Sequence, residues 1–228
     1  MRKEQVVAIL TRGRGRVTRH LMEQSRNLQV VARCGVGLDN IDLAAANERR
    51  VPVVYAPNST TTTVAEHTFM LILAAARRLC PIVGEVRAGN WGVRDGYQGV
   101  ELAGKTVGIV GMGAIGSRVA ALAEAFGMRV TYWSPSSRNE RYEFVPFESL
   151  LREADIVTLH VALNGGTHHL IGARELALMK PGAVLVNTAR GAIVAQPALA
   201  EALAAGRRAG YAKDVLEQEP PGADEALL

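Results

Sequence analysis

The stretch VGIVGMGAIGSRVA, residues 107–120, decides the fold class of this chain. It begins as a short apolar run typical of a buried parallel strand and ends with the periodicity of an amphipathic helix. Between the two halves, Gly111, Gly113 and Gly116 give the spacing G-x-G-x-x-G. In this context the glycines predict a tight turn whose backbone approaches a pyrophosphate at a helix N-terminus. The alternative is a strand–helix turn that binds no ligand.

Apolar runs rich in β-branched residues alternate with helical patterns on both sides of this turn. VVAIL (6–10) and VPVVYAP (51–57) are strand-like before it, and GAVLVNTA (182–189) is strand-like after it. Such alternation predicts an α/β fold, a Rossmann-type doubly wound parallel sheet with helices on both faces. The run TTTVAEHTFMLILAAARRL predicts one long helix that ends before Pro81, and residues 89–104 a connector.

The residue that ends the strand after the glycine turn bears on the choice of cofactor. Turns that bind NAD usually carry an acidic residue there, which contacts the ribose 2′-hydroxyl. This chain has Ser134, and Arg138 follows shortly. A serine does not repel a 2′-phosphate and an arginine can pair with one, so the sequence favours NADP slightly over NAD. The alternative is that Arg138 is a solvated loop residue.

Composition limits the class of protein. The chain has 228 residues, of which 48% are hydrophobic and 21% charged, with a formal net charge of +4. No apolar run reaches membrane-spanning length and the N-terminus lacks a signal-peptide pattern, so we expect a cytoplasmic protein without a membrane partner. The basic run RGRGRVTRH (12–20) predicts a solvated loop and helix start, with an anion or nucleic-acid contact as the alternative. Scattered arginines without interleaved aromatics argue against nucleic acid.

Several longer motifs make the chain resemble the D-isomer-specific 2-hydroxyacid dehydrogenases. They occur in the family order over nearly the whole chain: GVGLDNID (35–42), VPVVYAPNSTTTTVAEHT, ELAGKTVGIVGMGAIGSRVA, ADIVTLHV, LALMKPGAVLVNTARGAIV and DVLEQEP (214–220). NTARG and DVLEQEP together are far more specific than the glycine turn. The resemblance implies hydride transfer between NAD or NADP and a D-2-hydroxy acid or 2-oxo acid.

The resemblance also implies site residues. Arg190 of NTARG would bind the substrate carboxylate and the carbonyl oxygen, which suits a guanidinium fork. Glu219 would pair with the catalytic histidine and raise its pKa, and Asp214 would hold the nicotinamide carboxamide. The remaining implied positions are Ala114, Ile115, Val161 and Thr188 for the cofactor, and Gly35, Val36 and Gly37 for the substrate carboxylate.

The resemblance also defines an expected domain plan. We place an incomplete, flavodoxin-like substrate domain at residues 1–57 and a dinucleotide-binding domain at 58–228, with the active site in the cleft between them. Both ends look truncated against the family. The catalytic histidine of the family follows DVLEQEP, and none of the five histidines here stands in that motif. We therefore expect severely reduced turnover by this chain and preserved cofactor binding.

The sequence is also compatible with other functions. A non-catalytic NAD(H)-binding protein, similar to the C-terminal-binding corepressors, is the main alternative, and relatives that act on formate or phosphite are another. The family resemblance suggests a homodimer formed through the nucleotide-binding domain, with the helix from Val64 to Leu79 at the interface.

Overall fold

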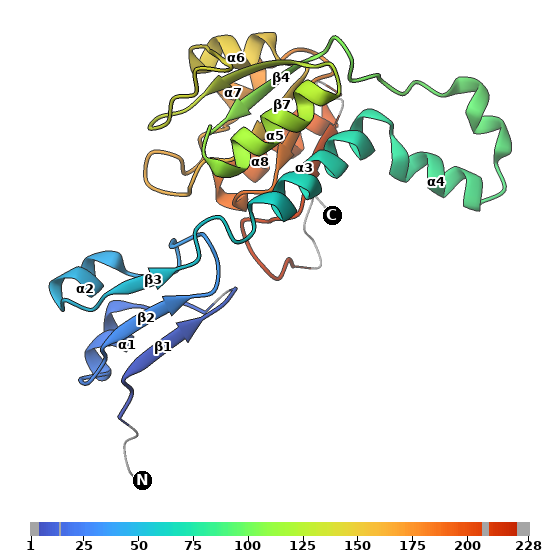
Figure 1. Cartoon of the computed structure of the whole chain (residues 1–228). Helices are drawn as coiled ribbons and strands as arrows, with labels where there is room; N and C mark the ends of the chain where they lie inside the picture. Colours follow the sequence, from blue (N-terminus) through green and yellow to red (C-terminus); the bar gives the residue numbers. More distant parts are fainter. Residues whose placement is uncertain (1–4, 14, 207–209, 223–228) are drawn as a thin grey trace. The chain divides into compact units, whose positions relative to one another are not determined.

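The chain divides into two units, Met1–Thr61 and Thr62–Leu228, in a computed structural model that describes residues 5–13, 15–206 and 210–222. The boundary lies after Thr61, close to the predicted boundary between residues 57 and 58. Figure 1 traces both units along the chain.

The first unit is a parallel three-stranded sheet in the order β1-β2-β3. Its elements are β1 (Ala8–Thr11), α1 (Arg19–Gln24), β2 (Val30–Arg33), α2 (Leu43–Glu48) and β3 (Val53–Tyr55). Side chains cap both helices: Thr18 Oγ1 accepts from the N–H of Leu21, and Asp42 Oδ1 accepts from the N–H of Ala45. Arg19, in the basic run, donates to Glu48 and so links the two helices.

The two faces of this three-stranded sheet differ in how far they are covered. Val31, in the central strand, packs with Met22 and Ala45 from the two helices. Leu10 and Val54 lie on the opposite face, since both pair in register with Ala32, and they are 72% and 51% exposed. Within the described part of this unit, helices therefore cover one face only.

The second unit contains a six-stranded parallel sheet in the order β6-β5-β4-β7-β8-β9. The strands are β4 (Thr106–Val110), β5 (Arg129–Trp133), β6 (Glu143–Phe144), β7 (Ile156–Leu159), β8 (Val184–Asn187) and β9 (Gly210–Lys213). The order reverses at β4, which gives the doubly wound topology that the sequence predicts. The two-residue strand β6 was not predicted.

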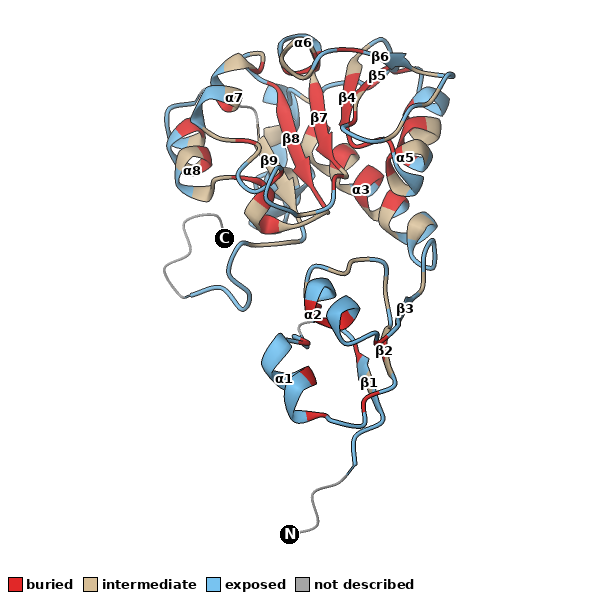
Figure 2. Cartoon of the chain, turned by 90° about the vertical axis from the view of Figure 1, so that its left-hand side faces the viewer, coloured by how far each residue is buried: buried red, intermediate tan, exposed pale blue. Residues whose placement is uncertain are grey.

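Helices cover both faces of this sheet. One face packs against α3 (Thr61–Ala76) and α5 (Ala114–Ala125), the other against α6 (Phe147–Glu153), α7 (Ala173–Leu178) and α8 (Gln196–Ala204). Successive residues of a strand point to opposite faces, so the two sides of β4 enter two different cores. Figure 2 shows the resulting burial of β4, β7 and β8.

The helical segment around Pro81 differs from the prediction. The long helix ends at Ala76, Arg78 adopts a left-handed backbone with φ of 48°, and a second helix, α4 (Leu79–Arg87), begins directly after it. Pro81 is tolerated because it stands in the first turn, where its missing N–H would have no intrahelical acceptor. The connector then forms a short 3₁₀ helix, η1 (Trp91–Gly96). Among the described residues, no helix is long and apolar enough to cross a membrane.

Candidate functional site

The glycine turn joins β4 to α5 at the carboxyl edge of the six-stranded sheet. Gly111 has φ of +105°, and a Cβ there would lie 2.6 Å from the carbonyl carbon of His160. A Cβ on Gly116 would lie 2.0 Å from the oxygen of Gly111. At Gly113, by contrast, a Cβ would meet no atom within 4 Å. Two glycines therefore allow close packing, and the third leaves its backbone facing open space.

This arrangement suits a dinucleotide. Gly113 is the N-cap residue of α5, and no side chain in the described part of the chain caps that N-terminus. The first N–H groups of α5, from Ala114 onwards, lack intrahelical acceptors and form the positive end of the helix dipole. This end of the helix lies next to the exposed Gly113. The open space at Gly113 and the uncapped N–H groups suit a bound pyrophosphate.

The neighbouring strand ends lie close to this turn. The N–H of Gly111 donates to the oxygen of Trp133, the last residue of β5, over 2.8 Å. Ser134 comes next and is buried, with its hydroxyl accepting from the N–H of Ser137. Arg138 Nη1 donates to the oxygen of Ser134 over 2.9 Å, and its guanidinium lies 4.2 Å from the ring centroid of Phe144. The predicted pair Ser134 and Arg138 is therefore adjacent at the end of β5.

The end of β7 forms the back of the turn. The N–H of Val161 would lie 2.7 Å from a Cβ on Gly111, and the side chain of Val161 is buried. His160, beside it, has Nε2 2.9 Å from Thr158 Oγ1. Burial lowers the pKa of His160 to about 4, so its imidazole is neutral at neutral pH. A neutral ring here adds no charge to the space that the phosphates would occupy.

The loop that follows β8 carries the NTARG motif and is held by Asn187. The side chain of Asn187 is fully buried; its Oδ1 accepts from the N–H of Ala189, and its Nδ2 donates to the oxygen of Arg190. Thr188 is tied to α3 by a buried hydroxyl–hydroxyl hydrogen bond of 2.7 Å with Thr68. These bonds fix the loop on both sides, so Arg190 is presented from a rigid backbone.

Charged side chains gather where this loop meets the end of β9. Asp214 follows β9, and His67 Nε2 lies 3.4 Å from its Oδ2. Burial raises the pKa of Asp214 and Glu219 adds to the rise, while its neighbours His67 and Arg190 lower it. Glu219 Oε1 also accepts from the N–H of Leu216. Arg190, Asp214 and Glu219, distant in the sequence, are thus electrostatic neighbours in the second unit.

The predicted substrate loop, Gly35 to Gly37, belongs to the first unit. Gly35, two residues after the end of β2, has φ of +151°, and the guanidinium of Arg33 lies 3.7 Å from the position of a Cβ there. Arg33 Nε donates to the oxygen of Gly37 over 3.1 Å, and Val36 is exposed. The loop from Gly35 to Gly37 is therefore organised by an arginine that precedes it.

Several contacts of this site escape sequence reasoning. His67 is an ordinary residue in a helical run, and Asn187 and Thr68 carry no periodic signal of their own. His67 and its partner Asp214 are at least 120 positions apart in the sequence, and so are Thr68 and its partner Thr188. The only usable signal is polar residues within otherwise apolar runs, which marks buried hydrogen-bonding groups.

Comparison with known proteins finds a family model and relatives that match most of the chain. Residues 69–228 match the family model described as "D-isomer specific 2-hydroxyacid dehydrogenase, NAD binding domain". The D-3-phosphoglycerate dehydrogenase of Methanocaldococcus jannaschii is 42% identical over 226 residues, which cover 96% of this chain and 43% of the relative. The glyoxylate reductase of Aeropyrum pernix is 47% identical over 216 residues, or 90% of this chain and 64% of the relative.

A solved structure agrees with these sequence matches. The D-lactate dehydrogenase of Aquifex aeolicus, complexed with NAD and lactic acid, is 32% identical with a TM-score of 0.92, covering 98% of this chain and 72% of that one. The chain spans between two fifths and two thirds of the length of the two curated relatives. Relatives of this kind do not favour the alternative of a non-catalytic interaction protein. The chain belongs to the D-isomer-specific 2-hydroxyacid dehydrogenase family.

Proposed function

We propose that the protein transfers a hydride between NAD or NADP and a D-2-hydroxy acid or its 2-oxo acid. The observation that carries the proposal is the shared carboxyl edge of one parallel sheet. An open glycine turn lies at β4 on this edge, and the Arg190–Asp214 cluster lies at β8 and β9. In doubly wound sheets this edge is where ligands bind.

Each residue has a distinct role in the proposed reaction. The turn from Gly111 to Gly116 and the first N–H groups of α5 bind the pyrophosphate. Asp214 accepts a hydrogen bond from the nicotinamide carboxamide. When bound, the reduced cofactor supplies the hydride that reaches C2 of the 2-oxo acid. Arg190 grips the substrate carboxylate and stabilises the charge that develops on the carbonyl oxygen.

The proton donor is not assigned to any of the five histidines of this sequence. The role of Glu219 as partner of an acid–base histidine, and that of Gly35, Val36 and Gly37 in carboxylate binding, stay predictions from the resemblance. His160 lies beside the glycine turn, and its burial keeps the imidazole neutral. We therefore give His160 no part in proton transfer.

The cofactor preference rests on the end of β5. No carboxylate follows this strand before Glu140, and Arg138 lies beside Ser134. These features support NADP slightly over NAD. Changing Arg138 to Gln should weaken NADPH binding and leave NADH binding nearly unchanged, because only NADPH carries the 2′-phosphate. Equal losses for both cofactors in fluorescence titrations would remove the proposed role of Arg138.

The substrate is proposed only as a class. The relatives named above are, by their names, a glyoxylate reductase and a D-3-phosphoglycerate dehydrogenase. Glyoxylate and a phosphorylated three-carbon 2-oxo acid therefore head the panel of substrates to test, with hydroxypyruvate and pyruvate.

The test separates binding from chemistry. Titration with NADH and NADPH should give saturable binding, and each 2-oxo acid of the panel is then tested for oxidation of the bound cofactor at 340 nm. Arg190→Gln should leave the cofactor Kd unchanged and lower any turnover by about 10²–10³, as for loss of a charge-stabilising donor. Arg26→Gln, at an exposed position of the first unit, is the matched control. Absence of cofactor binding at millimolar concentration would contradict the proposal.

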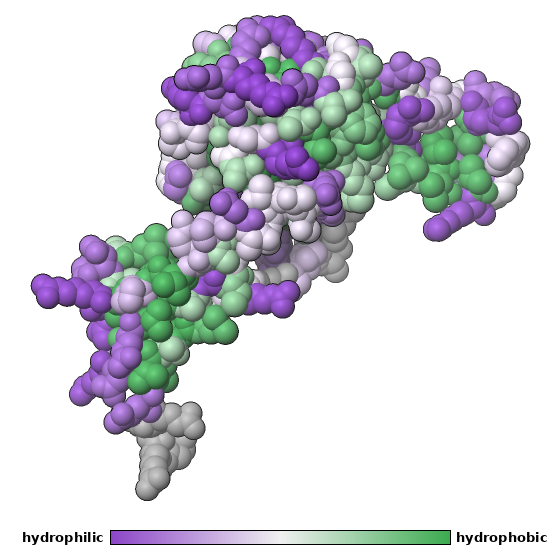
Figure 3. All heavy atoms as spheres, viewed as in Figure 1, coloured by the Kyte–Doolittle hydropathy of each residue, from purple (hydrophilic) through white to green (hydrophobic). Residues whose placement is uncertain are grey.

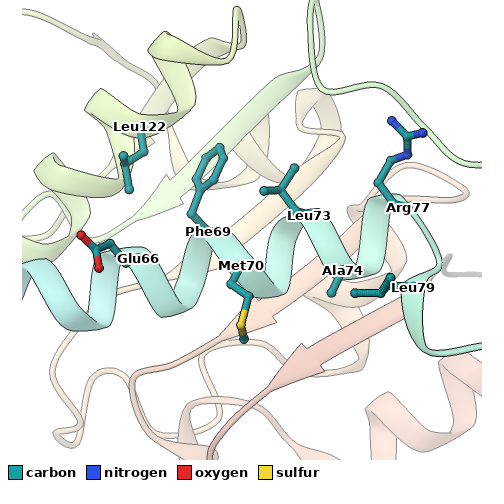
Figure 4. Close-up of a pocket in the computed structure, with 8 residues that line it drawn as sticks. All are labelled: Glu66, Phe69, Met70, Leu73, Ala74, Arg77, Leu79 and Leu122. Carbon is teal, nitrogen blue, oxygen red and sulfur yellow. The ribbon is translucent and has the colours of Figure 1, made fainter. Parts of the chain in front are cut away.

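We propose further that the protein forms a homodimer through the exposed face of α3. A groove of about 460 Å³ runs along this helix, and its lining is almost entirely apolar. Figure 4 shows Phe69 and Leu73 projecting from α3 on the side where Leu122 of α5 lies, while Met70 projects from another side of the helix. Met70 and Leu79 are 51% and 52% exposed.

The helix α4 and the 3₁₀ helix η1 extend this apolar surface, as the space-filling view shows (Figure 3). A second apolar groove on this arm is lined by Ile82, Val86, Trp91, Val93, Arg94 and Tyr97. Exposed apolar area of this extent supports a protein partner, and the family resemblance makes a second copy the occupant. A cytoplasmic location stays a prediction from the sequence.

A further inference from the structure

The loop between β7 and α7 carries two adjacent histidines, His168 and His169, that the proposed reaction does not use. Both are exposed, and their rings lie 4.0 Å apart, tilted by 34°. Glu217, from the segment after β9, joins them: His169 Nε2 lies 3.0 Å from Glu217 Oε1. One potential ligand atom from each of the three residues lies within 4.8 Å of the others.

From this geometry we infer a binding site for a divalent metal ion of the zinc class, held by His168, His169 and Glu217. Two imidazole nitrogens and one carboxylate oxygen form a ligand set that Zn²⁺ accepts, with water completing a four-coordinate shell. Magnesium and calcium prefer all-oxygen sites, so the two imidazoles select against them. An ion pair between His169 and Glu217 would explain two of the residues but gives no role to His168.

The backbone around the histidines holds the ligands in place. Successive side chains of an extended segment point to opposite sides, but His169 has φ of +51°, and both rings come together. The N–H of His169 donates to the oxygen of Ala192 over 2.8 Å. Thr167 is buried, and its hydroxyl donates to the oxygen of Ala162. The loop therefore has a fixed shape before any ion binds.

The segment that carries Glu217 is fixed by Gly191. A Cβ on Gly191 would lie 1.9 Å from the carbonyl carbon of Leu216 and 2.2 Å from the nitrogen of Glu217. Only a glycine permits this approach. The turn formed by Gly191 and Ala192 thus contacts both ligand-bearing segments, which brings Glu217 within reach of the histidines. Ligands already positioned lose less side-chain freedom on binding.

The test uses the whole chain without a polyhistidine tag, after treatment with a chelator and dialysis. Calorimetric titration at pH 8 with Zn²⁺ and with Co²⁺ should give saturable binding of one equivalent, and Co²⁺ should show visible absorption typical of imidazole ligation. Titration with Mg²⁺ should give none. His168→Ala, His169→Asn and Glu217→Gln should each weaken Zn²⁺ binding by about tenfold or more. Asparagine tolerates the left-handed backbone of position 169, which protects the fold of that variant.

His20→Ala is the matched control, because His20 is exposed and lies outside the cluster. It should bind Zn²⁺ as tightly as the wild type. Zn²⁺ should also raise the Tm of the wild type and of His20→Ala, but that of His169→Asn much less, since a ligand of the folded state stabilises it. The proposal fails if Zn²⁺ binds the wild type and His169→Asn equally well, if Mg²⁺ binds as well as Zn²⁺, or if no saturable equivalent is found.

Discussion

At the scale of single residues, buried polar groups do more to shape the site than the charged groups that would contact ligands. Asn187 is fully buried and bonds to both Ala189 and Arg190. Asp214 is partly removed from water, which raises its pKa, although its neighbours His67 and Arg190 lower it. A half-buried carboxylate with a raised pKa stabilises the fold less in its charged form, so this position is better explained by binding than by stability.

The neutral state of His160 leads to a prediction about acid stability. Its folded pKa of about 4 lies below the ordinary value of 6.5, so the unfolded chain binds more protons between these two values. Stability should therefore fall as the pH drops from about 6.5 towards 4, by up to about 3 kcal/mol. His160→Asn should flatten this part of the curve of unfolding free energy against pH, measured by urea denaturation. The exposed His20→Asn is the control and should follow the wild type; an unchanged slope in His160→Asn would contradict the assignment.

The buried amide of Asn187 should be costly to remove. Asn187→Ala leaves the N–H of Ala189 and the oxygen of Arg190 without these bonds, at a cost of about 1–3 kcal/mol in unfolding free energy. Cofactor and substrate binding should weaken as well, since the loop that presents Arg190 loses its support. The matched variant is Asn90→Ala, whose exposed amide bonds to Glu85. If both variants unfold at the same denaturant concentration, Asn187 does not stabilise the loop.

At the scale of secondary-structure elements, the turn from β4 to α5 combines two requirements in one short segment. Gly111 and Gly116 let the strand, the helix and the end of β7 pack closely, whereas the space at Gly113 is open. The first requirement concerns the fold and the second concerns the ligand. Gly111 and Gly116 should therefore tolerate substitution less well than Gly113.

Substituting alanine at two of these glycines should separate folding from binding. Gly113→Ala should lower the Tm only slightly, because its φ of −80° suits any residue and its Cβ meets no atom, although alanine is a poorer N-cap than glycine. It should weaken NAD(P)H binding by about tenfold or more, which corresponds to a loss of about 1.4 kcal/mol or more in binding free energy. Gly111→Ala should destabilise the protein by about 3 kcal/mol or more, through a positive φ and a contact with the His160 backbone. Thermal unfolding and fluorescence titration give both quantities. Unchanged cofactor binding by a folded Gly113→Ala variant would contradict the phosphate-binding role.

At the scale of the whole molecule, the exposed surface of α3 and α4 is too apolar to remain in water without cost. Both the groove beside Met70 and the arm that carries Trp91, which is 66% exposed, contribute to it. Removing such side chains from water is favourable by roughly 25 cal/mol per Å², which opposes the entropic cost of association. A second copy of the chain is a partner that is always present at the concentration of the protein itself.

Charged residues placed on this face should disrupt the proposed homodimer. Met70→Glu and Leu79→Glu should shift the protein from dimer to monomer in size-exclusion chromatography with light scattering, because each would bury a carboxylate in an apolar interface. Leu43→Glu is the control, since Leu43 is 46% exposed in the first turn of α2, where a carboxylate is well tolerated. A wild type that is monomeric at micromolar concentration would rule out the proposed interface.

The order of the elements and the type of each long one could be predicted from local patterns of residues. Continuous apolar strands and amphipathic helices carry their periodicity locally, so the parallel sheet and the turn at Gly111 follow from residues close together in the chain. Motif resemblance added Arg190, Asp214 and Glu219 as candidates. The boundary of the long helix was predicted wrongly, because the sequence gives no local signal for the left-handed backbone of Arg78.

Contacts between groups that are distant in the sequence could not be predicted and become visible in the folded chain. The hydrogen bond between Thr68 and Thr188, the pairing of His67 with Asp214 and the group of His168, His169 and Glu217 all join segments that are separate in the chain. The neutral imidazole of His160 likewise depends on burial by the rest of the fold. Periodicity reports which face of an element is buried, but electrostatics and hydrogen bonding depend on distances between elements, and packing sets those distances.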